Sequence, residues 1–141
     1  MFGNFRPGAS AYRQMSISTD ALAASPHQLI VMLFDGALNA IHTAIAQMRQ
    51  QNIEGKGRSI TRAIDIIGSG LAASLDTHLD AENGGDIAHQ LAALYDYLIR
   101  QLVTANLHND APALEEAAAL LQSLRDSWVA IGPAASQKAA A

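Results

Sequence analysis

The sequence contains no cysteine. This absence excludes disulfide bonds, catalysis by a thiolate, and zinc or iron–sulfur centres built from cysteine ligands. A chain without thiols also fits a reducing compartment, so we expect a cytoplasmic protein.

Basic side chains are few as well. Nine Lys and Arg residues, scattered from Arg6 to Lys138, leave a formal net charge of −4. Proteins that bind nucleic acid gather such residues into a patch or stripe that neutralises phosphates. The sequence therefore predicts no nucleic-acid partner.

Long apolar runs are also missing. No segment reaches the roughly 18 uninterrupted apolar residues that indicate a membrane-spanning helix. The first twenty residues contain Arg6, Arg13 and Asp20 and no apolar block like that of a secretion signal. We therefore expect a soluble chain without membrane insertion.

The residues that could carry chemistry do not combine into a site. No Glu stands three residues before any of the five histidines, as a di-iron helix bundle would require. The acids between residues 76 and 86 lack the spacing of a calcium-binding EF-hand. Residues 55–59, GKGRS, lack the glycine spacing and the preceding strand of a phosphate loop. No nucleophile, base and orienting residue can be assembled, so we expect no enzyme, no cofactor and no metal.

Apolar residues instead recur at steps of three and four in four segments. This is the spacing of helices that bury one face, and a chain of 141 residues, half of them hydrophobic, suits one domain with a sizeable core. The pattern predicts an all-α fold, an antiparallel up-down four-helix bundle. The four apolar stripes are Ile30, Phe34, Ala37, Ile41, Ala44 and Met48; Ile60, Ile64, Ile67, Leu71 and Leu75; Ile87, Leu91, Leu94, Leu98, Leu102 and Ala105; and Leu114, Ala117, Leu121, Leu124, Trp128 and Ile131.

Capping signals set the ends of these helices. Ser25, Pro26 and Gln28 form a capping box that starts the first helix, and Gly132 with the proline after it stops the last. The bundle should therefore span residues 25–131, with an N-terminal capping segment at 1–24 and a disordered tail at 132–141. The expected helices cover residues 25–51, 60–75, 86–107 and 110–131, with a turn at 52–58 and a loop at 76–85.

The first helix carries more apolar residues than one face can hold. Residues 29–34 are all apolar, and at about 100° per residue they surround the helix. If Ile30 and Phe34 point into the bundle, Val31 and Met32 lie about 100° and 200° away, on the outward side. Partial exposure at a tapered end of the bundle is one explanation, and a cover supplied by another segment or a guest is the other.

The N-terminal segment has the composition of such a cover. It contains Tyr12, Met15 and Ile17 among other apolar residues, and a wholly disordered tail would be poorer in them. On the third helix, Tyr95, Tyr97 and Ile99 add apolar surface beside the stripe. A helix-lined groove under a removable arm suits an apolar peptide.

Asp35 and Gly36 interrupt the apolar pattern of the first helix. Glycine costs a helix about 1 kcal/mol relative to alanine, so we expect Gly36 to permit the close approach of a neighbouring helix or segment. Asp35 should accept a hydrogen bond from the N-terminal segment or from another helix, or else be solvated.

Four stretches of the sequence resemble the family of the bacterial flagellar secretion chaperone FliS. They are TDALAASPHQLIVMLFDGAL, AIDIIGSGLAASLD, GGDIAHQLAALYDYLIRQLVTANLHND and LLQSLRDSW, and the similarity runs from about Ala11 to Ile131. The departures from the family pattern are in residues 52–59 and after Pro133.

The resemblance implies a cytoplasmic, non-catalytic export chaperone. Its partner would be the disordered C-terminal segment of flagellin, held unpolymerised until it reaches the flagellar export apparatus, and its N-terminal segment would cap the binding surface when empty. Tyr12 matches the family's N-terminal aromatic position, and Asn106 matches its ANL motif.

Together, the pattern and the resemblance give one set of candidate residues for flagellin binding or the N-terminal cap. Two alternatives stay open, a small bundle enzyme or metal carrier and a structural bundle that self-associates; we expect a monomer or weak homodimer. The candidates are Tyr12, Met15, Ile17, Val31, Met32, Asp35, Tyr97, Ile99 and Asn106.

Overall fold

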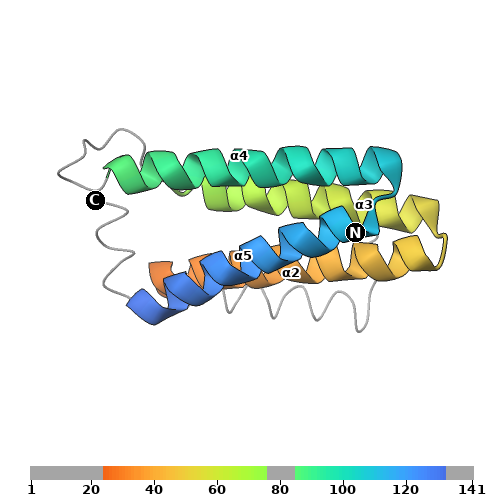
Figure 1. The fold of residues 1–141 in the computed structure, drawn as a ribbon. Helices are drawn as coiled ribbons and strands as arrows, with labels where there is room; N and C mark the ends of the chain where they lie inside the picture. Colours follow the sequence, from red (N-terminus) through yellow and green to blue (C-terminus); the bar gives the residue numbers. More distant parts are fainter. Residues whose placement is uncertain (1–23, 76–84, 133–141) are drawn as a thin grey trace.

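The computed structural model describes residues 24–75 and 85–132, and these residues form helices without a strand. Successive helices run in opposite directions and pack side by side (Figure 1), so the predicted antiparallel up-down four-helix bundle is confirmed. The expected segment at 1–24, the loop at 76–85 and the tail at 132–141 lie almost wholly outside the described residues. The elements are α2 (Pro26–Arg49), α3 (Ile53–Asp65), η1 (Ile66–Ala72), α4 (Gly85–His108) and α5 (Ala111–Ile131).

The start of α2 is fixed by the predicted capping box. The Ser25 hydroxyl accepts a hydrogen bond from the backbone N–H of Gln28 at 3.1 Å, and the Gln28 side chain accepts one from the backbone N–H of Ser25 at 2.9 Å. Two backbone donors that the helix itself cannot satisfy are thereby paired. The end of α5 is equally clear, because Gly132 adopts a φ of 75° directly after it, a conformation that favours glycine.

The turn predicted at residues 52–58 is wrong. Asn52 instead caps α3, which begins at Ile53, because its side chain accepts from the backbone N–H of Gly55 at 3.1 Å. Gly55 is buried in the first turn of the helix, where an added Cβ would lie 2.6 Å from the Gln47 side chain of α2. This glycine therefore serves helix packing, and the connection between α2 and α3 is only three residues long, Gln50 to Asn52.

The second expected helix continues from α3 into a wider π-helical segment, η1. Gly70 sits in η1 directly against Leu33 of α2, whose side chain would lie 2.9 Å from an added Cβ. Gly36 of α2 likewise approaches Ile66, because a Cβ added to this glycine would lie 3.4 Å from the Ile66 Cδ1, as expected for a glycine that permits close packing. Small residues thus bring α2 and η1 together.

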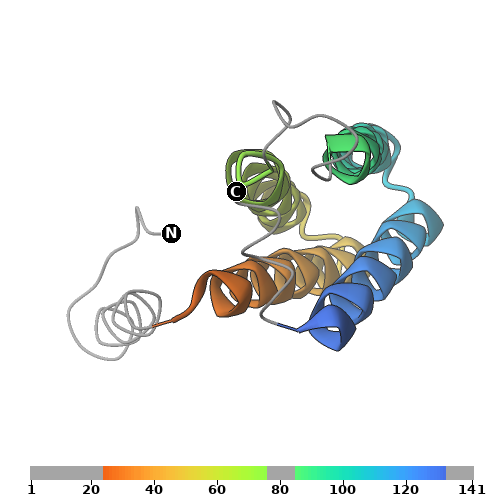
Figure 2. The same ribbon diagram turned by 90° about the vertical axis from the view of Figure 1, so that its left-hand side faces the viewer.

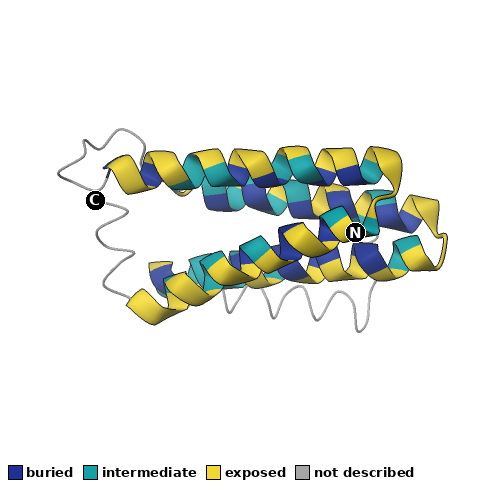
Figure 3. Ribbon diagram, viewed as in Figure 1, coloured by how far each residue is buried: buried dark blue, intermediate teal, exposed yellow. Residues whose placement is uncertain are grey.

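The core confirms most of the predicted stripes. Figure 3 shows the buried residues on the inner faces of the helices, and burying a Leu, Ile or Phe side chain contributes about 1.5–3 kcal/mol relative to leaving it exposed. Ile87 and Ile131, expected on two of the stripes, are instead exposed because they lie near helix ends, where neighbouring turns do not cover them. The largest fully buried side chains are Phe34, Ile41, Ile60, Ile67, Leu71, Leu98, Leu102, Leu114 and Leu121.

The helices form a ring in which each packs against two neighbours. Seen from the end where α2 begins and α5 ends (Figure 2), α2 lies between α3 and α5, while α4 closes the ring against α5, α3 and η1. We call the side of the ring where α2 packs against α5 the α2/α5 edge, and the side where α3 packs against α4 the α3/α4 edge.

Among the described residues, α2 is the one helix long and apolar enough to cross a membrane. Eight of its 24 residues are buried against the other helices, including Phe34 and Ile41. Core helices of soluble proteins share this composition, and the packing of α2 accounts for part of its apolar character.

Candidate partner-binding surface

The α2/α5 edge is closed at one end by a reciprocal contact between His27 and Trp128. The His27 Nε2–H donates to the Trp128 carbonyl at 2.9 Å, and the Trp128 Nε1–H donates to the His27 carbonyl at 3.1 Å. The two rings stack with centroids 5.1 Å apart and planes 15° apart. His27 is buried. Because the Trp128 carbonyl can only accept a hydrogen bond, the His27 ring carries a proton on Nε2. This histidine joins two helix ends.

Asp35 also contacts α5. Its carboxylate accepts a hydrogen bond from Arg125 Nε at 2.6 Å. This hydrogen bond and the negative charge of Asp35 raise the pKa of Arg125 above its ordinary value. The predicted partners of Asp35 were the N-terminal segment or another helix, and the structure places its carboxylate against a helix, α5.

The two surplus residues of α2 differ in direction. Val31 lies one helical turn from both His27 and Asp35, and both of these residues contact α5. Residues four apart share a helix face, so Val31 lies on the same side of α2 as these two residues. Met32 lies about 100° further round, on the outward side. Both side chains are half-buried.

Of the three α4 residues expected beside the stripe, only Tyr97 is an outward side chain. Tyr97 is 55% exposed, whereas Tyr95 is 3% exposed and belongs to the core. Burial raises the pKa of Tyr95 to about 12. Ile99 is half-buried against the core, and its Cδ1 lies 3.5 Å from the position of a Cβ on Gly68 of η1. The stripe of α4 therefore includes Tyr95, three residues before Leu98.

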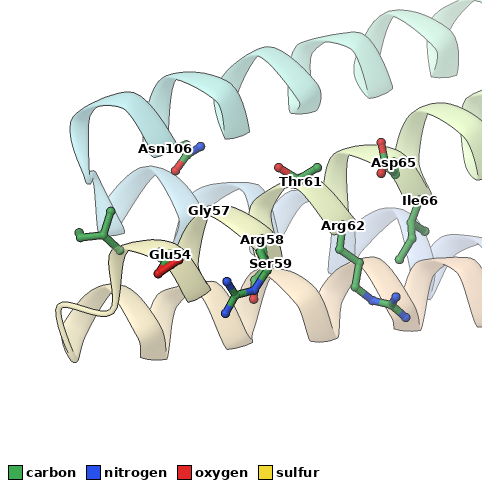
Figure 4. Close-up of a pocket in the computed structure, with 10 residues that line it drawn as sticks. Glu54, Gly57, Arg58, Ser59, Thr61, Arg62, Asp65, Ile66 and Asn106 are labelled. Atoms are coloured by element: carbon green, nitrogen blue, oxygen red, sulfur yellow. The ribbon is translucent and has the colours of Figure 1, made fainter. Parts of the chain in front are cut away.

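A groove of about 850 Å³ runs along α3 toward the end of α4. Figure 4 shows Asn106 projecting from α4 toward α3, and Thr61 and Asp65 projecting from α3 toward α4, while Arg58 and Arg62 point away from α4. We call this feature the α3 groove. Its lining residues are Ile53, Glu54, Gly57, Arg58, Ser59, Thr61, Arg62, Asp65, Ile66 and Asn106.

The α3 groove is open at Gly57. An added Cβ at this glycine would meet no atom within 4 Å. Ile53, four residues before Gly57, is 57% exposed. On α4, Val103 and Leu107 lie on either side of Asn106 and are 45% and 73% exposed. The surface thus combines apolar side chains with an amide, two carboxylates and two guanidinium groups, which is the mixed chemistry that a peptide segment presents in return.

The structure does not gather the candidate residues into one cluster. Val31, Met32 and Asp35 lie on α2, whereas Tyr97, Ile99 and Asn106 lie on α4, across the ring from it. Tyr12, Met15 and Ile17 lie outside the described residues. The described candidates therefore occupy two separate parts of the bundle surface.

Sequence reasoning missed the α3 groove and a buried lysine of α3, Lys56, whose side chain bonds the end of α4. Extending the stripe of Ile60 and Ile67 back by one turn leads to Lys56, so the periodicity contained a signal that a basic residue faces inward. Because we expected a turn at residues 52–58, the helical periodicity was not extended to Lys56. Within the residues that the structure describes, no group of three His, Asp or Glu side chains is arranged to hold a metal ion.

Comparison with known proteins identifies the family. The model of the family described as "Flagellar protein FliS" matches residues 8–135. The chain is 47% identical over 129 residues to the flagellar secretion chaperone FliS of Salmonella typhimurium strain LT2, covering 92% of this chain and 93% of that protein. It is 42% identical to the protein of that name from Escherichia coli strain K12, over 86% of both chains.

More distant relatives show the same relationship. The flagellar secretion chaperone FliS of Bacillus subtilis strain 168 is 31% identical over 119 residues, 84% of this chain and 81% of that protein. The family match at residues 8–135 extends over all four helices of the bundle. The chain is therefore a member of the FliS family of flagellar secretion chaperones.

Proposed function

We propose that this protein is a cytoplasmic, non-catalytic export chaperone for flagellin. It binds the disordered C-terminal segment of flagellin, prevents premature polymerisation and delivers the segment to the flagellar export apparatus. Membership of a family of secretion chaperones supports this role. The single structural observation that carries it is the open α3 groove beside the exposed apolar side chains of α4.

The chemistry of this surface suits a segment that folds as it binds. Such segments bury about 1,000–3,000 Å² to offset the cost of becoming ordered, so they need a long contact surface with apolar anchors. Val103 and Leu107, on either side of Asn106, are exposed anchors on α4, whereas Tyr97 is exposed on the face that it shares with Gln101, whose side chain bonds Ala113 of α5. The Asn106 amide at the wall of the α3 groove offers one donor group and one acceptor to a peptide main chain.

We further propose that residues 1–24 cover part of the bundle surface in the free protein. Tyr12, Met15 and Ile17 would supply the covering side chains, and Met32 on the outward side of α2, together with Val31, would receive them. Deleting residues 1–22 should then increase the binding of a dye specific for exposed apolar surface while the helix content of the bundle stays the same. Unchanged dye binding would exclude a cover.

Titration calorimetry with the C-terminal segment of flagellin tests the main proposal. We expect a one-to-one complex with a negative heat-capacity change, because apolar surface is buried. A Leu107→Ala variant, at an exposed position next to Asn106, should bind more weakly, and Gln122→Ala, at an exposed position of α5, is the matched control that should bind as the unchanged chain does. The absence of a complex at micromolar concentrations would overturn the proposal.

Light scattering of the same samples addresses the self-associating alternative. A free protein that is monomeric or weakly dimeric and forms a one-to-one complex supports the chaperone. A stable dimer that flagellin leaves unchanged would support a structural bundle instead.

A further inference from the structure

Lys56 is a buried basic residue whose hydrogen-bond partners in the described part of the chain are neutral amide oxygens. It is 4% exposed, and its Nζ donates to the backbone carbonyl of Asn106 at 2.9 Å and to the Asn109 Oδ1 at 2.6 Å. A buried charge is costly unless hydrogen bonds compensate it. Both of these compensating groups belong to the end of α4 and the turn that follows.

These contacts stabilise an otherwise incomplete helix end. The last carbonyls of a helix have no partner within it, and the N–H of Asp110 bonds to Ala105 rather than to Asn106. Lys56 therefore provides a partner for the Asn106 carbonyl, at the negative end of the helix dipole, where a cation is favourable. Asn109 adopts a φ of 50°, and its side chain is held by the same ammonium group.

Asn106 has two roles in this arrangement. Its backbone carbonyl is bound by Lys56, and the residue lines the α3 groove, to which Lys56 itself contributes no lining atom. Figure 4 shows the Asn106 side chain between α4 and α3. The position of this amide thus depends on a residue that a guest cannot touch.

We propose that Lys56 is a positioning residue for guest binding, because its hydrogen bonds to the turn after α4 fix the Asn106 amide where it can bond a peptide group of the flagellin segment. This inference rests on the proposed function and deepens it. Binding energy at the groove then comes through Asn106, with Lys56 determining how well the amide is oriented before the guest arrives.

The test is a double-mutant cycle on the full chain. The dissociation constant of the flagellin C-terminal segment is measured by calorimetry for the unchanged protein, Lys56→Met, Asn106→Ala and the double variant. The loss of one well-oriented hydrogen bond weakens binding by about tenfold. We expect each single substitution to have that effect and the double variant to be no weaker than Asn106→Ala, because Lys56 acts through Asn106.

Two further variants separate positioning from a loss of charge or of the fold. Arg100→Met removes a positive charge from α4 at an exposed site paired with Asp96 and should leave the dissociation constant within about twofold, since exposed charge pairs contribute little. Lys56→Arg keeps a donor for the Asn106 carbonyl and should restore much of the affinity. If Lys56→Met does not fold, Lys56→Gln, which keeps a neutral donor, takes its place in the cycle.

Unchanged affinity in the Lys56 variant would overturn the inference, and so would effects that multiply to about a hundredfold in the double variant. In both cases the unchanged chain still binds flagellin, and the proposed function stands. If the unchanged chain does not bind the segment, the proposed function fails and the inference with it.

Discussion

The α2/α5 edge and the α3/α4 edge of the bundle are built differently. Along α2, three side chains contact α5 through polar groups: His27 with Trp128, Asp35 with Arg125 and, at the far end, Arg49 with Glu115 at 2.6 Å. Along α3, the Lys56 contacts occupy one end, and an open groove lies beside them.

The two edges also differ in how far their apolar side chains are buried. On α2 the surplus is partly used by the fold, because Val31 lies on the side that contacts α5 and both Val31 and Met32 are half-buried. On α4, Val103 and Leu107, on either side of Asn106, remain exposed. A helix neighbour absorbs apolar surface only on the side where it packs, so the open edge is where a guest gains most from burial.

The largest effect is expected from Trp128→Ala, which would open the closed edge. It removes a half-buried ring stacked on His27 and the hydrogen bond from Nε1, so the free energy of unfolding should fall by about 2–4 kcal/mol. Urea denaturation measures this change. Val129→Ala, at an exposed neighbouring position, should change stability by less than about 0.5 kcal/mol. Equal effects of the two substitutions would show that the His27–Trp128 contact does not close this edge.

The second prediction compares how the stability of the protein depends on pH through a buried and an exposed tyrosine of α4, Tyr95 and Tyr97. Folding favours the neutral form of Tyr95, whose pKa rises from 10.0 to about 12, so its contribution is complete below pH 10 and is lost as the pH rises toward 12. Near pH 11.5 the unchanged protein should have lost about 2 kcal/mol on this account.

Urea denaturation at about pH 9 and about pH 11.5 tests this in matched variants. Tyr95→Phe should lack that part of the loss, whereas Tyr97→Phe, at an exposed site two residues away, should retain it. The same pH dependence in both variants would mean that Tyr95 ionises as freely in the folded protein as in the unfolded chain.

The third prediction concerns a side chain added at Gly57, in the open α3 groove. Gly57→Leu places a side chain where an added Cβ meets no atom within 4 Å, so the fold should be unchanged or more stable by up to about 1 kcal/mol, the helix cost of glycine. The same side chain would occupy the α3 groove and weaken binding of the flagellin segment by about tenfold, or about 1.4 kcal/mol.

Gly57→Ala is the control for that experiment. It gives a similar gain in helix propensity with far less bulk, so its affinity should stay near that of the unchanged protein. Equal affinity for Gly57→Leu would place the guest elsewhere on the bundle.

The smallest effect concerns the ion pair between Asp35 and Arg125. Its side chains are 53% and 28% exposed, and such pairs contribute about 0.2–1 kcal/mol. A double-mutant cycle with Asp35→Asn and Arg125→Gln should give a coupling energy in that range, reduced by added salt. The Asp96–Arg100 pair within α4 provides a comparison. A coupling energy of several kcal/mol would mean that this ion pair, rather than the His27–Trp128 contact, closes the edge.

The existence of the helices and most of their buried faces could be predicted because both depend on local spacing. Phe34, Ala37 and Ile41 follow the helical period and are all buried, and the capping box at Ser25 begins α2 where the sequence places it. These features need only neighbours along the chain. Their interpretation does not depend on which helix packs beside them.

The errors occurred where packing overrides a local preference. Gly55 and Gly57 favour a turn by composition, yet a capping residue, Asn52, and the approach of Gln47 allow a helix at residues 53–65. The apolar pattern of α4 places Tyr95 beside the stripe, but its ring fills the core. Neither outcome follows from spacing, because both depend on the shape of the neighbouring helix.

Of the candidate site, the sequence indicated Tyr97 as an outward side chain, and Asn106 came from the family resemblance. The α3 groove joins Asn106 to residues some fifty positions earlier in the chain. Lys56 shows the same limit, since its partners are the Asn106 carbonyl and Asn109. Such contacts require knowledge of which helix ends meet.

The sequence by itself determined an all-α chain, the caps at Ser25 and Gly132, and membership of a chaperone family, because periodicity, capping and motifs are written in consecutive residues. Only the tertiary structure decided that His27 joins α2 to α5, that Lys56 is buried beneath Asn106, and that a groove stays open at Gly57. The physical reason is that a burial or a hydrogen bond between distant residues depends on the ring order and orientation of whole helices, which no local pattern specifies.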